Sequence, residues 1–333
     1  MSGRALLAAV AVLASLAAVP TAAADGPMPF AAQGGNGVLS LDGANRYVAV
    51  AANSGADTTL EIIRTNGGTV WNTVQLDGAW GIPIVSFSGN GEGLSADGGT
   101  LVLADVIRSY PHKLSRFLVL DIRSLQVRTG FFLRGDFEFD ALSPDASRLY
   151  LIQHVNAVDQ SRYVVRAYDL AAHRLLRGRV ADRTQKSWVM QGYPQARATS
   201  ADGRWVYTLY QNPGGYPFVH ALDTVRGVAH CIGLPWHGGP NGFYNMRVSL
   251  RDHDRTLAVH WLSGRPWVAV DTATWRVSRD HRAGFPWPAV AGGTAAALAG
   301  LAAFLLRRRR RRCAALEEEL SELLRHEEPE LVA

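Results

Sequence analysis

A twelve-residue motif returns several times in this chain, and its recurrence constrains the fold more than any other feature. Residues 94–105 read LSADGGTLVLAD, residues 142–153 read LSPDASRLYLIQ, and residues 199–210 read TSADGRWVYTLY. The serines of five such units, spaced by 55, 48, 57 and 49 residues, are Ser40, Ser95, Ser143, Ser200 and Ser249. A period near fifty residues is typical of architectures in which each repeat is one supersecondary unit.

A second marker follows each serine and divides the unit into strands. In four units it is an aspartate 22 to 26 residues later, namely Asp121, Asp169, Asp223 or Asp271, whereas the first unit has Arg64 at this place. Alternating, β-branched and aromatic residues predict four short strands per unit, and no long amphipathic helix is predicted within 25–285. In the turn after the serine, Asp can cap backbone N–H groups and Gly accepts a positive φ.

Each unit resembles a blade of the YVTN and TolB-like β-propeller families. The resemblance lies in the S-x-D-G turn, the strand of the RWVYTLY kind and the later strand ending in L-D or V-D. The resemblance covers about 40–285 and implies an all-β fold, a β-propeller of about five four-stranded blades. A sixth, degenerate blade is the alternative count, and residues 28–33 can supply an outer strand that closes the ring on the last blade. A β-sandwich with chance turn similarity is less compatible with five aligned turns. Propellers host many roles, so the resemblance speaks for fold and not for function.

The N-terminal 24 residues have the layout of a secretory signal peptide. Arg4 gives a charged start, residues 5–19 are an apolar run, and residues 22–24 form a small-residue cleavage signal. An uncleaved membrane anchor is the alternative, which Pro20 and the A-x-A site argue against. We therefore expect a signal peptide over 1–24 and an extracytoplasmic β-propeller over 25–285.

The C-terminal part predicts one membrane span. Residues 289–306 are apolar and uncharged, and six consecutive arginines follow at 307–312. At about 1.5 Å per residue such a run covers roughly 27 Å, enough to cross a hydrocarbon core. Arginines that flank a span mark its cytoplasmic side, and Trp287 suits the interface. A helix buried in a soluble domain is the alternative, but the arginine run has no place in a globule.

These features predict the topology of the whole chain. A transmembrane helix over 288–306 would pass through the lipid bilayer, with an Arg cluster and acidic tail in the cytoplasm over 307–333. The protein would lie in the cell membrane as a single-pass protein with its N-terminal domain outside. The net charge of +5 is concentrated in the arginine run, so the pI of 9.4 is weak evidence for a nucleic-acid partner and none is expected. Cys231 and Cys313 fall on opposite sides of the predicted membrane and cannot pair within one chain, so a hydrophobic core must hold the domain together.

Loop lengths distinguish the two faces of the predicted disc. The S-x-D-G turns and the third-to-fourth turns share one face, called the turn face here, and they are short. The second-to-third loops and the connections between units share the opposite loop face, where they are long, rich in Gly and Pro, and aromatic. Function collects on loops held by a rigid scaffold, so the loop face is the predicted binding face, although such aromatics can also fill gaps between blades. Its candidate residues are Trp80, Tyr110, His112, His154, Trp188, Tyr193, Tyr216, Trp236, His237 and Tyr244.

The first strand of each unit is expected to line a central channel. Polar and apolar residues alternate there, which places the polar set on one side of the strand. We expect Arg–carboxylate pairing within a solvated lining. The predicted lining residues are Asn90, Glu92, Glu138, Asp140, Gln195 and Arg197.

No catalytic set, metal site or cofactor is predicted. His154 and His260 fall at the end of the second strand of their units and His112 in the equivalent loop, but no H-x-x-x-H or C-x-x-C spacing supports a metal. Residues 252–254 read DHD, which lacks the regular spacing of a Ca²⁺ loop. Glu138 and Asp140 share a strand face and point the same way instead of flanking a substrate.

Three functions remain open on the sequence. The first is a membrane-tethered extracytoplasmic binding or scaffold module for a protein, peptide or cell-envelope glycan. The alternative is a propeller hydrolase or lyase acting on envelope polysaccharide through Glu92, Glu138 and Asp140, so that enzyme activity is uncertain with a leaning towards none. The third is a sensor that signals through the tail. Carboxylates that converge in one pocket would favour the enzyme, and salt-bridged ones would favour binding.

Overall fold

The computed structural model describes residues 31–52, 55–106, 111–182, 184, 189–212, 215–236 and 240–280. The predicted signal peptide, membrane span and tail lie outside these residues. Within the described part of the chain, no helix is both long and apolar enough to cross a bilayer.

Five antiparallel sheets, formed in chain order, make up the described residues. The first contains β2 (Val38–Leu39), β3 (Asn45–Ala52), β4 (Asp57–Arg64) and β5 (Val70–Leu76). The second contains β1 (Ala31–Ala32), β6 (Trp80–Pro83), β7 (Thr100–Asp105), β8 (Leu114–Asp121) and β9 (Gln126–Arg134). The third contains β10 (Phe137–Leu142), β11 (Arg148–His154), β12 (Arg162–Asp169), β13 (Arg174–Leu175) and β14 (Met190–Gln191), which pairs with β12.

The last two sheets repeat the four-strand order without additions. The fourth contains β15 (Tyr193–Thr199), β16 (Trp205–Gln211), β17 (Phe218–Asp223) and β18 (Val228–Gly233). The 3₁₀ helix η3 (Pro240–Asn245) leads into the fifth, which contains β19 (Met246–Arg251), β20 (Thr256–Trp261), β21 (Pro266–Asp271) and β22 (Val277–Arg279).

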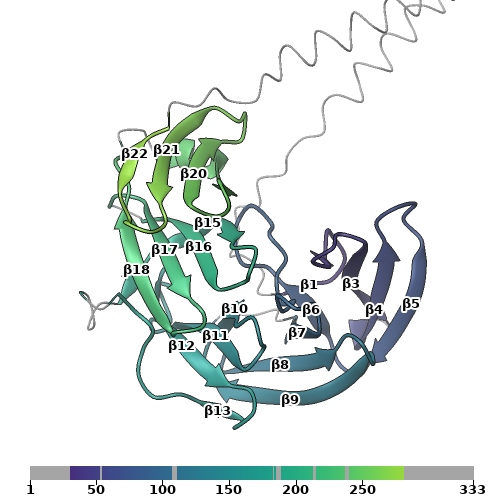
Figure 1. Cartoon of the computed structure of the whole chain (residues 1–333). Helices are drawn as coiled ribbons and strands as arrows, with labels where there is room; N and C mark the ends of the chain where they lie inside the picture. The colour runs from purple at the N-terminus through teal and green to yellow at the C-terminus, as the bar shows by residue number, and fades with distance from the viewer. Residues whose placement is uncertain are drawn as a thin grey trace, which may run out of the picture.

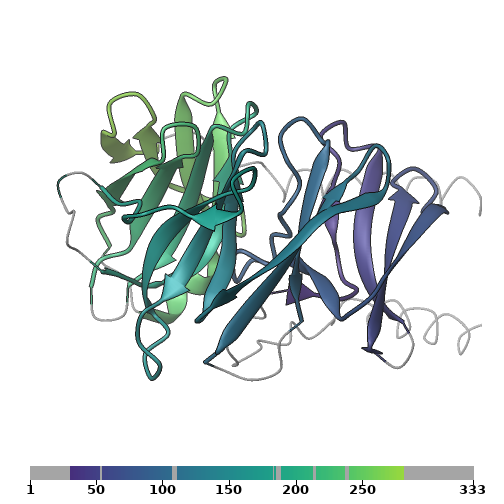
Figure 2. The same ribbon diagram turned by 90° about the horizontal axis from the view of Figure 1, so that it is seen from below.

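The sheets stand around a common centre like the blades of a propeller. Figure 1 shows β1, β6, β10 and β15 near the middle and β5, β9, β13, β18 and β22 at the periphery. The first and fifth sheets form the two ends of an arc, and Figure 2 shows the sheets side by side from below. Apolar clusters fill the spaces between neighbours; one of them joins the third and fourth sheets through Tyr150, Tyr163 and Tyr210. The described residues therefore confirm an all-β fold made of several antiparallel sheets of four or five strands, consistent with a β-propeller.

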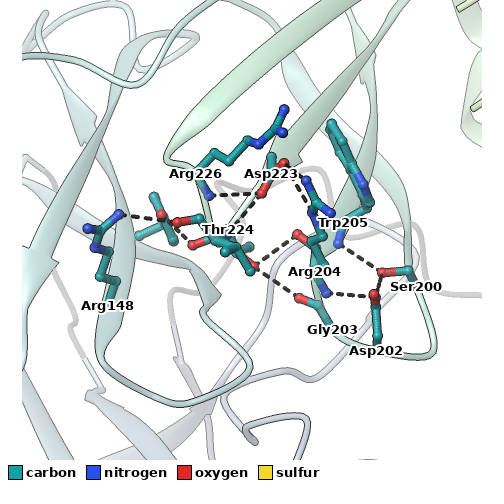
Figure 3. Close-up of polar contacts among 11 residues, drawn as sticks. Arg148, Ser200, Asp202, Gly203, Arg204, Trp205, Asp223, Thr224 and Arg226 are labelled. Carbon is teal, nitrogen blue, oxygen red and sulfur yellow. Dashed lines mark hydrogen bonds and ion pairs between the residues drawn. The ribbon is translucent and has the colours of Figure 1, made fainter. Parts of the chain in front are cut away.

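The S-x-D-G turns are built by one repeated set of hydrogen bonds. In the fourth sheet the Ser200 hydroxyl donates to Asp202 at 2.6 Å and accepts from the Trp205 amide at 2.8 Å, and Asp202 accepts from the Arg204 amide at 3.0 Å (Figure 3). Ser40, Ser95 and Ser143 make the same bonds to the aspartate two residues on. These bonds lower the pKa of each aspartate, the serine hydroxyl contributing most.

The second marker ends the third strand in every sheet. Asp121, Asp169, Asp223 and Asp271 are the last residues of β8, β12, β17 and β21, and Arg64 is the last residue of β4. Each of the four carboxylates accepts bonds from the backbone amides two and three residues later, as between Asp223 and the amides of Val225 and Arg226. The strand ends here because the following amides donate to the carboxylate instead of to a neighbouring strand.

The fifth turn departs from the others. Asp252, His253 and Asp254 all have φ between 56° and 65°, a conformation that costs side-chain-bearing residues free energy. The Asp254 carboxylate accepts a bond from the Ala201 amide at 2.7 Å and so joins the fifth turn to the fourth. The DHD sequence is therefore a left-handed turn that contacts its neighbour.

Two expectations about the inner strands are wrong. Residues 31–32 do not extend the last sheet; β1 pairs with β6 in the second sheet, through Ala31 with Pro83 and Ala32 with Ile82. Trp80 was placed in a loop between blades but begins β6, which pairs with the end of β7. Both changes follow from the apolar run at 80–85, whose Ile82 and Val85 are buried at the centre of the molecule.

Candidate functional site

A cavity of about 240 Å³ opens on the turn face at the centre of the arc. Its walls come from the first four sheets, and three turn residues, Leu41, Ala96 and Ala201, lie around it with Leu142 from the end of β10. Because tight turns of separate sheets converge here, the backbone that surrounds the cavity is short and firmly hydrogen-bonded.

Arg197, which lines the base of the cavity, forms a buried ion pair with Asp140. Arg197 on β15 and Asp140 on β10 are 5% and 2% exposed. One guanidinium nitrogen of Arg197 donates to the Asp140 carboxylate, another to the Asp140 carbonyl, and Nε donates to Thr208 at 3.0 Å. Burial alone would lower the pKa of Arg197, but Asp140 and then Glu92 raise it above its ordinary value. The guanidinium is thereby held charged inside the molecule and ties the third sheet to the fourth.

Glu92 is the second carboxylate of this cavity and differs from Asp140 in its contacts. It lies half-buried between β6 and β7, and its amide donates to the Pro83 carbonyl at 2.9 Å. Among the described residues no cationic side chain makes an ion pair with it, although Arg197 and Asp140 act on it electrostatically. Burial raises the pKa of Glu92 above its ordinary value, Arg197 opposes the rise, and Asp140 adds to it.

The walls above this floor are mostly apolar. Leu39 and Leu41 of the first sheet are 47% and 69% exposed and reach the cavity from one side. Leu94, Phe139 and Val206 contribute from the second, third and fourth sheets. An apolar wall with a few convergent polar groups at its base is typical of small-ligand and side-chain pockets.

The opposite, loop-face end of the channel is covered by residues 84–91. This segment connects β6 to the S-x-D-G turn of the second sheet, and it reaches across the centre to the fourth sheet. The Phe87 amide donates to the Pro194 carbonyl at 2.9 Å, and the Ser88 amide donates to the Gln195 carbonyl at 3.1 Å. Asn90 accepts bonds from the hydroxyls of Ser86 and Ser88 and holds the segment in shape. We call residues 84–91 the cross-channel loop.

Three aromatic rings stand together over the cross-channel loop. The Phe87 ring lies 6.1 Å from that of Tyr193 and 6.5 Å from that of Tyr244, measured between centroids. All three side chains are exposed. The structure therefore brings together two of the ten predicted loop-face residues and adds Phe87, which the sequence did not single out.

Two histidine–carboxylate pairs lie at the loop-face end of the third sheet. His154 Nε2 is 2.5 Å from Glu138 Oε1, and its Nδ1 is 2.7 Å from the Gln160 carbonyl. His112 Nδ1 is 2.8 Å from Asp136 Oδ1, with both side chains buried. Burial would lower the pKa of His154, but Glu138, aided by Asp136, raises it to about 9.

The other predicted site residues are dispersed. Trp236 contacts Phe243 and Trp267 at 5.3 and 5.2 Å between ring centroids, so it fills a gap between blades. The Trp80 indole donates to the Asp77 carbonyl at 2.7 Å. Tyr216 is exposed. The remaining three of the ten, which lie outside the described residues, are Tyr110, Trp188 and His237.

The six predicted channel residues divide among several environments. Glu92 and Arg197 line the cavity, Asp140 is locked to Arg197, and Glu138 faces His154. The Gln195 amide donates to the Tyr244 carbonyl at 2.8 Å, and Asn90 belongs to the cross-channel loop. In the described part of the chain, no three His, Cys, Asp or Glu side chains are grouped to hold a metal ion.

The sheets and their arrangement define a β-propeller-type repeat protein. No protein-family model matches the sequence, and no curated protein matches it. Among solved structures, the β-propeller domain of Cps50 (Swd1) from Myceliophteria thermophila matches with a TM-score of 0.45 and 10% identity, over 77% of this chain and 74% of that chain. TolB from Acinetobacter baumannii matches with a TM-score of 0.37 and 15% identity, over 72% of this chain and 54% of TolB.

An enzyme is also among the similar structures. Puromycin hydrolase matches with a TM-score of 0.43 and 14% identity, over 78% of this chain and 40% of the hydrolase. The chain thus resembles β-propeller proteins, TolB included, and spans about half the length of TolB. At these TM-scores the likeness says nothing further, so function must be argued from the residues themselves.

Proposed function

We propose that this chain is an extracytoplasmic binding module whose turn-face cavity receives a side chain from a protein or peptide partner. The single observation that carries this is the cavity of about 240 Å³, with apolar walls from four sheets and a polar floor at Arg197 and Glu92. Its size suits one side chain and not a folded surface, and its apolar walls suit a peptide better than a glycan. The binding role is thereby assigned to the turn face, in place of the loop face expected from loop lengths.

The state of the carboxylates supports binding over hydrolysis. Glu138 faces His154 at 2.5 Å and Asp140 contacts Arg197, so both candidate acids are held in ion pairs with other strands. Glu138 and Asp140 lie in separate environments. Of the three carboxylates that the enzyme alternative would use, only Glu92 lines the cavity. A glycosidase-type mechanism needs two carboxyl groups facing one substrate.

The binding proposal can be tested with a random peptide library displayed on phage and the purified full-length chain. We expect a selected peptide family whose binding falls by about tenfold or more, roughly 1.4 kcal/mol, when Leu39 and Leu41 are both changed to Glu. Both leucines are exposed, so these changes should leave folding intact. Leu262→Glu is the matched control, because Leu262 is 62% exposed and lies in the turn between β20 and β21 on the loop face. Equal loss in the control, or none in the double variant, would contradict the proposal.

The membrane tether is part of the same proposal and rests on the sequence of residues 288–312 alone. Carbonate extraction of membranes should leave the full-length chain in the pellet and release a chain that lacks 288–333. Release of both forms would remove the tether from the proposal.

A further inference from the structure

The charges around the turn-face cavity do not cancel. Arg197 supplies one positive charge, whereas Asp140 and Glu92 supply two carboxylates. The Asp140 carboxylate and the Asp140 carbonyl each accept a hydrogen bond from the Arg197 guanidinium. Arg197 is consequently committed to Asp140, and ionised Glu92 is the charge left without a direct counter-ion among the described residues.

The Glu92 carboxylate lies in an environment that disfavours its ionised form. A half-buried carboxylate beside apolar walls loses hydration that an ion pair would replace. The raised pKa of Glu92 agrees with this, because burial is its main cause and the charge of Arg197 does not fully offset it. A cationic group placed in the cavity would supply the missing counter-ion.

The walls of the cavity restrict what can carry that cation. Leu39, Leu41 and Leu94 line the same cavity as Glu92, so a cation on an apolar stem could bury that stem against these leucines. A primary ammonium is a compact point charge, whereas a guanidinium is planar and wider, so the ammonium suits a cavity of about 240 Å³ better. A primary ammonium also offers three donors, which the Glu92 carboxylate can accept together with the nearby Thr199 hydroxyl, itself a cavity residue.

We propose that the turn-face cavity is selective for a primary ammonium group on an aliphatic stem, as in a lysine side chain, with the Glu92 carboxylate as its counter-ion. This inference rests on the proposed function, since it names the chemistry of the group that the cavity receives. It adds a charge requirement that an apolar pocket alone would not have.

The inference implies that binding depends on pH. The charged groups that face Glu92 are Arg197 and Asp140, which form an ion pair with each other, and Thr199 is its polar neighbour. Binding requires ionised Glu92, so affinity for the ammonium should be low at acid pH and rise as the pH increases through the pKa of Glu92. Bound ammonium favours the ionised form, so binding below that pKa should release protons.

The test uses three probes with the same stem, namely hexylammonium, hexanol and hexanoate, titrated calorimetrically into the full-length chain in a mild detergent. We expect hexylammonium to bind about tenfold or more tightly than hexanol and hexanoate to bind most weakly, in line with the strength of charge-assisted hydrogen bonds. In Glu92→Gln the preference should fall to about one while hexanol binding persists. The pH dependence of hexylammonium binding should disappear in the same variant.

The glutamine variant is isosteric and uncharged, so its unfolding midpoint should equal or exceed that of the parent, which separates lost recognition from lost folding. Equal binding of hexylammonium and hexanol, or an unchanged preference in Glu92→Gln, would overturn the inference and leave the cavity as a binding site. Tightest binding by hexanoate would also overturn it, since the floor would then act as an anion site through Arg197. If none of the probes binds, the ammonium inference is wrong, and the peptide selection decides the proposed function independently.

Discussion

The two ends of the central channel are closed in different ways. At the turn face the channel widens into a cavity whose floor is held by the charged pair Arg197 and Asp140. At the loop face it is covered by the cross-channel loop, held by two backbone hydrogen bonds to the fourth sheet. The turn face, with its short turns, therefore contains an open cavity, whereas the loop face, with its long loops, is covered by the cross-channel loop. The difference teaches that loop length is a poor guide to where a propeller is hollow.

The largest expected effect concerns the charged floor of the turn-face end. Arg197→Met leaves Asp140 buried without its counter-ion, and we expect the free energy of unfolding to fall by about 3–5 kcal/mol. Arg116→Met is the matched control, because Arg116 pairs with buried Asp105 at 3.0 Å but its own side chain is 56% exposed. Loss of that pair should cost about 1 kcal/mol or less. Urea unfolding measures both, and equal losses would show that the buried Arg197–Asp140 pair is no more critical to stability than the partly exposed Arg116–Asp105 pair.

The loop-face end should respond to pH through His154. Its folded pKa of about 9 lies above the unfolded value of 6.5, so protonated His154 stabilises the folded state. That contribution is fully present below pH 6.5 and is lost as the pH rises through 9, on the order of 2–3 kcal/mol. Urea unfolding at pH 6 and pH 9.5 measures it, with His154→Gln as the reference that removes the titrating group.

A stability difference between pH 6 and pH 9.5 that is the same in the parent and in His154→Gln would contradict this assignment. The variant also removes the contact with Glu138, so its absolute stability should be lower at pH 6.

The smallest expected effect is a difference between two glycine variants in the turns of the turn face. Gly203 and Gly98 occupy the same place in two S-x-D-G turns, with φ of 70° and 67°. A Cβ on Gly203 would lie 2.5 Å from the Ala96 Cβ of the second sheet, whereas a Cβ on Gly98 would meet nothing within 4 Å. Gly98→Ala should cost about 1 kcal/mol for its backbone alone, and Gly203→Ala about 1–3 kcal/mol more. Thermal unfolding compares them, and equal shifts would mean that the two turns do not touch in solution.

The strand pattern was predictable because its signals are local. Ser200 and Asp202 bond to backbone groups within five residues, and Asp223 ends its strand by accepting from the amides two and three residues later. Interactions of this range repeat wherever the residues repeat, so the sequence predicts each turn and each third-strand end. The same reasoning predicted that Glu92 and Arg197 would face the channel.

The rest of the site depends on contacts between distant segments. Phe87 reaches Pro194 more than a hundred residues away, and no periodic pattern marks residues 84–91 as a cover. The sequence places Glu138 on the same strand face as Asp140 but gives no sign of its ion pair with His154 on the neighbouring strand. Such a pair depends on the register between strands and on side-chain length, and the alternation of polar and apolar residues along one strand predicts neither.

The cross-channel loop also has a consequence for how the molecule unfolds. In a repeat array each unit contacts only its neighbours, so blades can in principle melt one after another from the ends. The bonds from Phe87 and Ser88 to the fourth sheet join units that are not adjacent in the chain. Loss of the third sheet would break them as well. We therefore expect the second, third and fourth sheets to unfold together and fraying to begin in the first and fifth sheets.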